Sequence, residues 1–383
     1  MRARDRATRL ALPLAACAFG LALGEAGLRL LERRGDGGAH LVADPLLGYR
    51  MAPGAPGHDA RGFRNASALE TAELVAIGDS QTWGVNARVQ EAWPQQAGVL
   101  LGLRAYNMSQ GSWGGLHYAS LLPEALALRP RVVVFGLYLG NDLYDSYRLV
   151  SMREAYASLR RPGLGPPLDR QRQADALWAE HVAGQASPRL SPLAAWSLWL
   201  RGHTALGRLL ERAGILPGDA WFEAGAAWAR DHPAHGAVCD CGATRTVLTT
   251  AYRLLAVDLD APGIREGLRL TGLALERGAS ACAAARVRFL VLVIPTKERV
   301  YADRMRAAQP LHPVYARLVA MEDRAREAVL AGCAADGIEC VDALPPLAAA
   351  VAAGSAVYPS TTESHPSARG YRVLAELVAG RLR

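Results

Sequence analysis

The sequence predicts an α/β protein built on a parallel sheet, with a helical insertion and an N-terminal transmembrane helix. Short apolar runs alternate with amphipathic stretches from residue 73 onward, one long interval interrupts this alternation, and an uncharged apolar run follows a basic N-terminus. Continuous apolar runs are typical of strands buried on both faces, so we expect helices to cover both faces of the sheet.

The composition excludes several classes of protein. The chain has 383 residues, 51% of them hydrophobic, which is enough for a full core, and six cysteines are too few for a disulfide-built mini-scaffold. The formal net charge is +7, but residues 1–34 hold seven arginines against three acidic residues. Because the remainder has no basic run, we expect no nucleic-acid partner.

The N-terminal segment, 1–34, predicts a membrane anchor. Residues 1–9 carry four arginines and one acidic residue, and 10–24 carry no charge. A helix over 10–31 would be about 33 Å long, close to the thickness of a bilayer core. The basic leader favours a single-pass protein whose bulk lies outside the cytoplasm, in the bacterial periplasm or at the cell exterior. The alternatives are a cleaved signal peptide and a lipoprotein modified at Cys17.

Outside the anchor the chain has five cysteines, at 239, 241, 282, 333 and 340. In an oxidising compartment the simplest expectation is two disulfides and one free thiol. Cys239 and Cys241 are too close in sequence to pair comfortably with each other, so we expect each to pair elsewhere or to stay free. A zinc site of these two cysteines with His232 and His235 matches no usual ligand spacing, so we predict neither a metal nor a cofactor.

The elements follow in order after the anchor. Segment 35–70, rich in Gly, Pro, Ala and Asp, is expected to be an extended connector to a domain over 71–383. The expected strands are 73–77, 103–108, 131–139, 287–294 and 337–341, and the expected helices are 115–128, 262–285, 313–335 and 367–382. In such sheets ligands bind beyond the carboxyl ends of the strands.

One interval, 143–260, contains no clear strand and holds five of the eight tryptophans. We interpret it as a helical insertion with its own small core, because apolar residues are usually buried. The alternative is a lid over the site, or a surface for a membrane or a partner.

Polar residues follow the expected strands. Ser80 stands in the sequence GDSQTWG directly after the first strand, and a serine nucleophile needs a base. His365, in the sequence SHPS before the last helix, is the only histidine in such a position. Gly111 follows the second strand and Asn141 the third, so a backbone N–H and a side-chain amide are available to stabilise an oxyanion.

In this order and placement the sequence resembles the SGNH (GDSL-type) hydrolase family over 70–145 and 285–383. The resemblance implies a three-layer α/β/α, flavodoxin-like fold and the hydrolysis or transfer of ester-linked acyl groups. It implies Ser80 as nucleophile, His365 as base, and an oxyanion hole of the Ser80 and Gly111 N–H groups with the Asn141 side chain. The anchor, the connector and the sequence PTKE at 295–298 resemble a membrane-tethered, exported subgroup.

The sequence departs from the family pattern twice. Gly111 lies four residues after Asn107 where the family glycine usually lies five after, so the N–H of Ser112 is an alternative donor. The family acid usually lies two or three residues before the histidine, where this chain has Glu363 and Thr362. We expect Glu363 to orient His365, with a Ser–His dyad as the alternative.

Three further charged residues are expected to contact the substrate: Asp79, Asp142 and Lys297, the sole lysine of the chain. The sequence thus predicts a serine esterase acting on an acyl ester such as acetylated carbohydrate of the cell envelope. The alternatives are an O-acetyltransferase of envelope polysaccharide and a non-catalytic envelope module that binds glycan or a partner.

Overall fold

The computed structural model describes residues 24–25, 40–184, 196, 199–200, 204–212, 219–241 and 244–383. Its centre is a five-stranded parallel sheet with the spatial order β4-β3-β5-β8-β9. The strands are β3 (Leu74–Gly78), β4 (Ala105–Ser109), β5 (Val132–Tyr138), β8 (Arg288–Ile294) and β9 (Glu339–Asp342). Counted along the chain this is the order 2-1-3-4-5, which also occurs in flavodoxin-like sheets. The predicted α/β class and parallel sheet are confirmed.

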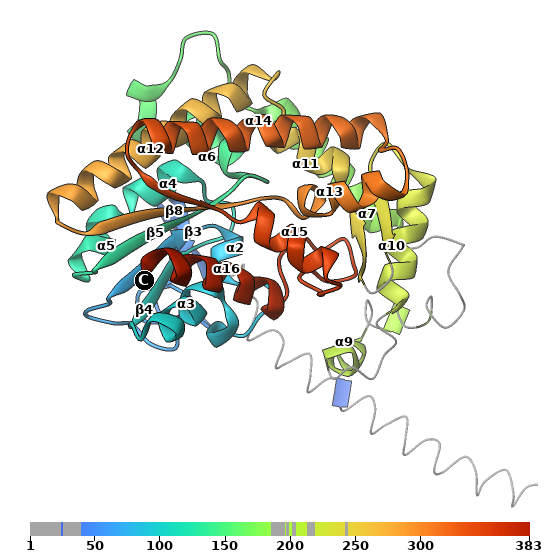
Figure 1. Ribbon diagram of the computed structural model, residues 1–383, viewed down its shortest axis with the longest axis horizontal. Coiled ribbons are helices and arrows are strands. Elements are labelled where there is room, and N and C mark those ends of the chain that lie inside the picture. The colour runs from blue at the N-terminus through green and yellow to red at the C-terminus, as the bar shows by residue number, and fades with distance from the viewer. Residues whose placement is uncertain are drawn as a thin grey trace, which may run out of the picture.

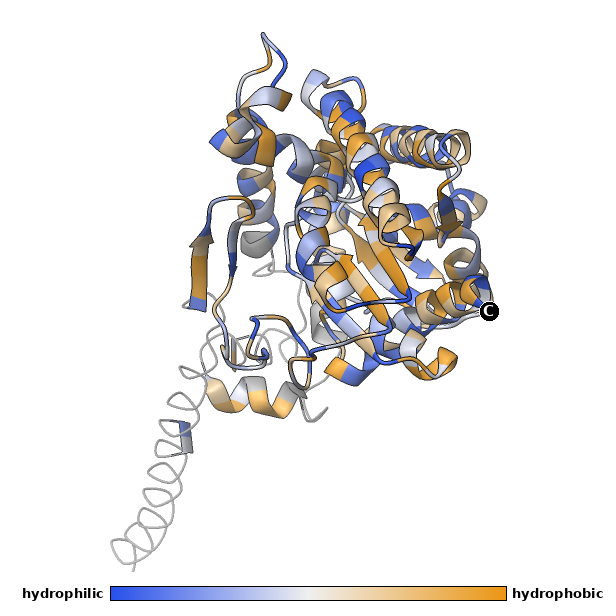
Figure 2. Ribbon diagram, turned by 90° about the vertical axis from the view of Figure 1, so that its left-hand side faces the viewer, coloured by the Kyte–Doolittle hydropathy of each residue, from blue (hydrophilic) through white to orange (hydrophobic). Residues whose placement is uncertain are grey.

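The strands are apolar throughout because both faces of the sheet are covered. Successive side chains of a strand point to opposite faces. Accordingly Leu74 and Ala76 belong to one buried cluster, whereas Val75 and Ile77 belong to the other. Figure 2 shows the hydrophobic strands enclosed by helices whose ribbons alternate between hydrophilic and hydrophobic residues.

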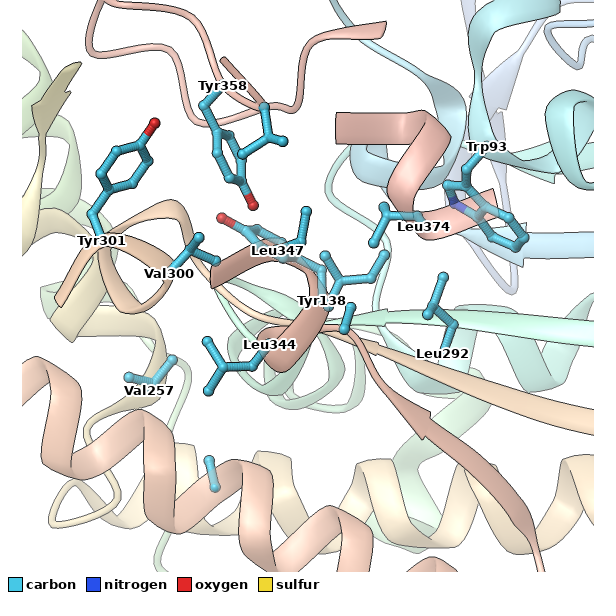
Figure 3. Packing of buried hydrophobic residues seen from close by; sticks show 14 of the residues in the cluster. Trp93, Tyr138, Val257, Leu292, Val300, Tyr301, Leu344, Leu347, Tyr358 and Leu374 are labelled. Carbon is cyan, nitrogen blue, oxygen red and sulfur yellow. The ribbon is translucent and has the colours of Figure 1, made fainter. Parts of the chain in front are cut away.

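Helices lie on both faces, an arrangement compatible with three α/β/α layers (Figure 1). One face carries α3 (Trp93–Leu101), α13 (Lys297–Ala308), α15 (Leu344–Ala352) and α16 (Ala368–Leu382). The other carries α4 (Gly115–Ser120), α5 (Leu122–Ala127), α12 (Pro262–Ala284) and α14 (Pro313–Ala335), the last of which contributes to both clusters. Figure 3 shows how Tyr138 and Leu292 of the sheet meet Leu347 and Leu374 of the covering helices.

The predicted helices 262–285, 313–335 and 367–382 are confirmed to within a residue at either end. The stretch 115–128 is two helices instead of one, separated at Leu121. Pro123 lies in the first turn of the second helix, where its missing N–H costs nothing.

The described part of the expected connector is not extended but packed on the domain. It begins with an antiparallel hairpin of β1 (Leu41–Asp44) and β2 (Gly48–Met51). Phe63 is buried in one of the sheet's two clusters, and Arg64 donates hydrogen bonds to the carbonyl oxygens of Trp83, Gly84 and Ala87. At Gly62, with φ +82°, a Cβ atom would lie 2.2 Å from the Met51 carbonyl oxygen. Only glycine fits this close approach of two backbones.

The insertion is mostly helical, but the expectation that it has no strand is wrong. An antiparallel hairpin of β6 (Ala237–Cys241) and β7 (Thr244–Leu248) lies within it. A small cluster around Phe222, Trp228 and Val247 gives it the expected core of its own. Its helices include α6 (Asp142–Met152), η3 (Glu154–Leu159), α7 (Leu168–Gly184), α9 (Ala205–Arg212), α10 (Asp219–Asp231) and α11 (Thr250–Val257).

The cysteine pairing differs from the expectation. Cys239 and Cys241 form a disulfide with each other, with their Cα atoms 5.4 Å apart, while Cys282, Cys333 and Cys340 are free. Residues i and i+2 of a strand project to the same side, which brings the two sulfur atoms within bonding range. The predictions of two disulfides and of no Cys239–Cys241 pair are therefore both wrong.

No helix in the described ranges is long and apolar enough to cross a membrane. The predicted anchor over 10–31 lies outside the described residues, apart from Gly24 and Glu25.

Candidate active site

Ser80 lies at the carboxyl edge of the sheet, where the chain turns from β3 into α2 (Ser80–Trp83). The turn is so tight that a Cβ atom at Gly78 would lie 2.1 Å from the Thr82 hydroxyl oxygen. Asp79 begins the helix by accepting a hydrogen bond from the Gln81 N–H at 2.8 Å. The Ser80 side chain is thereby left at the wall of a cavity.

His365 and Glu363 meet Ser80 from the other end of the chain. They belong to the loop that precedes α16, a helix begun by the Ser367 side chain. His365 Nε2 lies 2.8 Å from Ser80 Oγ, and its Nδ1 contacts Glu363 Oε1. The same carboxylate oxygen accepts the His365 backbone N–H at 3.0 Å. The structure thus brings serine, imidazole and carboxylate into one hydrogen-bonded row.

Glu363 is held in its ionised form. Burial by itself would raise its pKa, but the hydrogen bond and the charge interaction with His365 lower the pKa to about 2. A carboxylate that accepts from Nδ1 fixes the imidazole tautomer that leaves Nε2 free to accept the serine proton.

Of the predicted oxyanion donors, Gly111 lies beside the serine and Asn141 lines the same cavity. A Cβ atom at Gly111 would be 3.8 Å from Ser80 Cβ, and Ser112 and Asn141 line the same cavity as Ser80. Within the described chain the N–H groups of Ser80, Gly111 and Ser112 donate to no other residue. Asn141 Nδ2 donates to Asp145 Oδ2 at 2.7 Å. Both Gly111 and Ser112 therefore remain candidate donors.

Two residues that sequence reasoning did not assign hold this region in place. The Tyr49 hydroxyl, on β2, donates to the Gly111 carbonyl oxygen at 2.6 Å. Arg148, on α6, pairs with Asp145 at 3.1 Å and reaches the Ser112 carbonyl oxygen at 3.4 Å. Burial raises the pKa of Asp145 to about 6. The only sequence signal for Tyr49 is its presence in the connector, whose packing the sequence does not reveal.

The cavity over Ser80 has a volume of about 820 Å³, within the range of small-molecule sites. Its walls come from the insertion as well as from the sheet edge: α6 contributes Tyr144, α7 contributes Trp178, and α11 contributes Tyr252 and Arg253. The insertion therefore forms part of the binding cavity, which combines aromatic and charged side chains.

The structure corrects the expectation that Asp79, Asp142 and Lys297 contact the substrate. Asp79 and Asp142 are fully buried, and burial raises the pKa of Asp79 to about 6 and that of Asp142 well above its usual range. Asp142 accepts from the Tyr118 hydroxyl at 2.8 Å and from the Tyr138 N–H at 2.9 Å. These carboxylates hold the turns on which Ser80 and Asn141 lie.

Lys297 is also fully buried, at the start of α13. Its Nζ lies 2.8 Å from the carbonyl oxygens of Val247 and Thr361, 2.9 Å from that of Glu363 and 3.1 Å from Thr246 Oγ1. Burial lowers the pKa of Lys297 to about 8. The sole lysine therefore ties the loop of Glu363 to the β7 strand instead of reaching substrate.

Among the described residues, no group of three or more His, Cys, Asp or Glu side chains is placed to hold a metal ion. No protein-family model and no curated protein matches the chain. The geometry of the site offers a nucleophile, an oriented base and unpaired N–H donors in one cavity.

Proposed function

We propose that the protein is a serine esterase of the SGNH type that hydrolyses ester-linked acyl groups. The observation that carries the proposal is the row Ser80–His365–Glu363, with 2.8 Å between Ser80 Oγ and His365 Nε2. Residues 285 positions apart in the sequence meet at the wall of one cavity. A nucleophile within hydrogen-bond reach of a base, itself oriented by a third group, is the signature of nucleophilic catalysis.

The mechanism would proceed in two acyl-transfer steps. His365 takes the proton of Ser80 as the serine oxygen attacks the ester carbonyl, and Glu363 stabilises the resulting imidazolium. The Ser80 N–H, the Gly111 or Ser112 N–H and the Asn141 amide would donate to the oxyanion. His365 then protonates the leaving alcohol, and water, deprotonated by the same imidazole, releases the acyl group from Ser80.

The proposed setting is the outside of the cytoplasmic membrane, with the protein held through residues 10–31 and acting on acyl esters such as acetylated envelope carbohydrate. The sequence pattern of the N-terminal segment supports the setting. The mixture of aromatic and polar residues in the cavity wall supports a polar, hydroxyl-rich substrate.

The test is hydrolysis of p-nitrophenyl esters, from acetyl to octanoyl, by the purified full-length protein. We expect turnover that is lost in Ser80→Ala, together with labelling of Ser80 by a fluorophosphonate probe. Ser151→Ala is the matched control, because this serine lies near the C-terminal end of α6, where its hydroxyl donates to the Tyr147 carbonyl oxygen, and does not line the cavity. Equal turnover in the wild type and Ser80→Ala would overturn the proposal, and turnover that requires an added alcohol would indicate a transferase.

A further inference from the structure

Three arginines line the cavity over Ser80, and one of them has no carboxylate partner. Arg148 pairs with Asp145 at 3.1 Å, and Arg170 lies 3.7 Å from Asp258. Arg253, on α11, forms no ion pair with any described residue. An arginine in a cavity wall normally has a carboxylate or another anion beside it, because an unpaired buried charge is costly.

The head group of Arg253 is nevertheless held in a fixed position. Its Cζ lies 5.1 Å from the centre of the Tyr252 ring and 5.8 Å from that of Tyr138, distances at which aromatic rings attract a cation. Its Nη2 donates to the Ser364 hydroxyl, and its Nε is buried with no hydrogen-bond partner. A guanidinium has five N–H donors, so most of them remain available.

The hydrogen bond to Ser364 places Arg253 next to the proposed catalytic residues, because Ser364 lies between Glu363 and His365 in the chain. A group bound to this guanidinium would lie in the same cavity as the Ser80 hydroxyl. Burial disfavours the charge of Arg253, but Tyr138 and the carboxylates of Glu298 and Glu363 raise its pKa above the ordinary value, so the side chain stays cationic.

We propose that Arg253 binds a carboxylate carried by the substrate, so that the enzyme prefers esters of acidic molecules; this inference rests on the proposed esterase function. The planar fork of a guanidinium matches the two oxygens of a carboxylate. The acid belongs either to the acyl part or to the alcohol part of the ester. A carboxylate at this position would form the close ion pair that Arg253 makes with no described residue, since Glu298 and Glu363 act on the guanidinium only from beyond ion-pair distance.

The test compares matched charged and neutral esters in the full-length protein. Glutarate mono-p-nitrophenyl ester and p-nitrophenyl pentanoate place the charge in the acyl part; 3-acetoxybenzoate and its methyl ester place it in the alcohol part. We expect the wild type to favour the charged member of one pair, and Arg253→Gln to lower its kcat/KM by roughly 10- to 100-fold. On the neutral ester of the same pair, kcat/KM of Arg253→Gln should fall less than threefold. Arg253→Lys keeps the charge but lacks the planar fork of the guanidinium, so its kcat/KM on the charged ester should lie between that of the wild type and that of Arg253→Gln.

Two control variants separate substrate binding from support of the loop. Ser364→Ala removes the one hydrogen-bond contact of Arg253 with the His365 loop but keeps the guanidinium, so the charged-to-neutral preference should persist. Arg170→Gln should also preserve this preference, because Arg170 already has Asp258 and the Leu255 carbonyl oxygen as partners. An equal loss on both esters in Arg253→Gln, or no preference in the wild type, would overturn the proposal.

A binding measurement keeps this inference separate from the esterase proposal. Calorimetry with 3-acetoxybenzoate and with glutarate, on Ser80→Ala and on Ser80→Ala combined with Arg253→Gln, reads the anion site without turnover. We expect binding of at least one probe that weakens roughly tenfold or more in the double variant. Binding of neither probe to Ser80→Ala would overturn the anion site. An absence of Ser80 labelling by the fluorophosphonate would instead contradict the esterase.

Discussion

Two polar regions lie at the carboxyl edge of the sheet, and they differ in what covers them. The row Ser80–His365–Glu363 lines the cavity, whereas Lys297, which follows β8 as Ser80 follows β3, is fully buried among four oxygen acceptors. Position after a strand therefore predicts that a residue lies at this edge. It does not predict whether the side chain faces the cavity or the protein.

The buried region supports the open one. Lys297 binds the carbonyl oxygens of Thr361 and Glu363 in the loop that carries His365. Its neighbour Glu298 accepts from the N–H and hydroxyl of Thr249, the residue before α11. Substitutions in the open row should consequently remove turnover without unfolding the protein, and those in the buried region should affect both.

The largest effect is expected for His365→Ala. Loss of the base should lower kcat on p-nitrophenyl acetate by about 10⁴-fold or more. The protein should stay folded, with some loss in the free energy of unfolding at neutral pH, because Glu363 loses the imidazole that lowers its pKa. His312→Ala is the matched control, because His312 begins α14 by accepting the Val314 N–H and does not line the cavity. Loss of this cap should cost about 1 kcal/mol in urea unfolding without affecting kcat. Turnover at the wild-type level in His365→Ala would remove the open row from the mechanism.

The next effect is expected for Glu363→Gln, which keeps the shape but cannot stabilise an imidazolium. We expect kcat to fall roughly 10²-fold or more. The pKa of Glu363 is about 2 in the folded protein against an ordinary value of 4.5. Its contribution to stability is therefore complete above pH 4.5 and is lost as the pH falls toward 2. Urea unfolding across this window should show the wild type losing stability faster than the variant; parallel curves would contradict the pairing.

Lys297→Met tests the buried region. Four oxygen atoms lose their donor, so we expect a loss of about 3 kcal/mol in the free energy of unfolding, with kcat reduced roughly tenfold because the Glu363 loop loosens. A raised KM with unchanged stability would instead indicate that Lys297 contacts the substrate, and would contradict its assignment to the buried region.

The pKa of Lys297 adds a second measurement on the same variant. Its value is about 8 in the folded protein against an ordinary 10.5. Between these values the unfolded chain binds more protons than the folded one, so this group makes stability rise with pH. The wild type should gain stability relative to Lys297→Met from pH 8 to 10.5.

The smallest effect is expected for Tyr49→Phe, which removes the hydroxyl that donates to the Gly111 carbonyl oxygen. We expect kcat to fall about threefold and stability by about 1 kcal/mol, because a single hydrogen bond is lost. Tyr156→Phe is the matched control: its hydroxyl pairs with that of Ser120 at 2.5 Å, outside the cavity lining. An equal kcat in the two variants would show that Tyr49 does not position the oxyanion loop.

The sequence alone predicts the five strands of the central sheet, the helices α12, α14 and α16, and the order of Ser80, Gly111, Asn141 and His365 along the chain. Alternating apolar runs carry that information because both faces of the sheet must be buried. The sequence also points to Glu363, since it lies two residues before His365. The resemblance to a known family, rather than composition or spacing, supplied the roles of these residues.

Which polar side chains face the cavity depends on the tertiary structure. The burial of Lys297, the packing of Phe63 and Tyr49 from the connector, and the unpaired guanidinium of Arg253 each depend on segments that are distant in sequence. The β6–β7 hairpin was missed for a related reason, because its short strands of mixed polarity are stabilised by pairing with each other. Local patterns record the period of an element and the chemistry of its residues, whereas burial and pairing depend on what the rest of the chain brings against them.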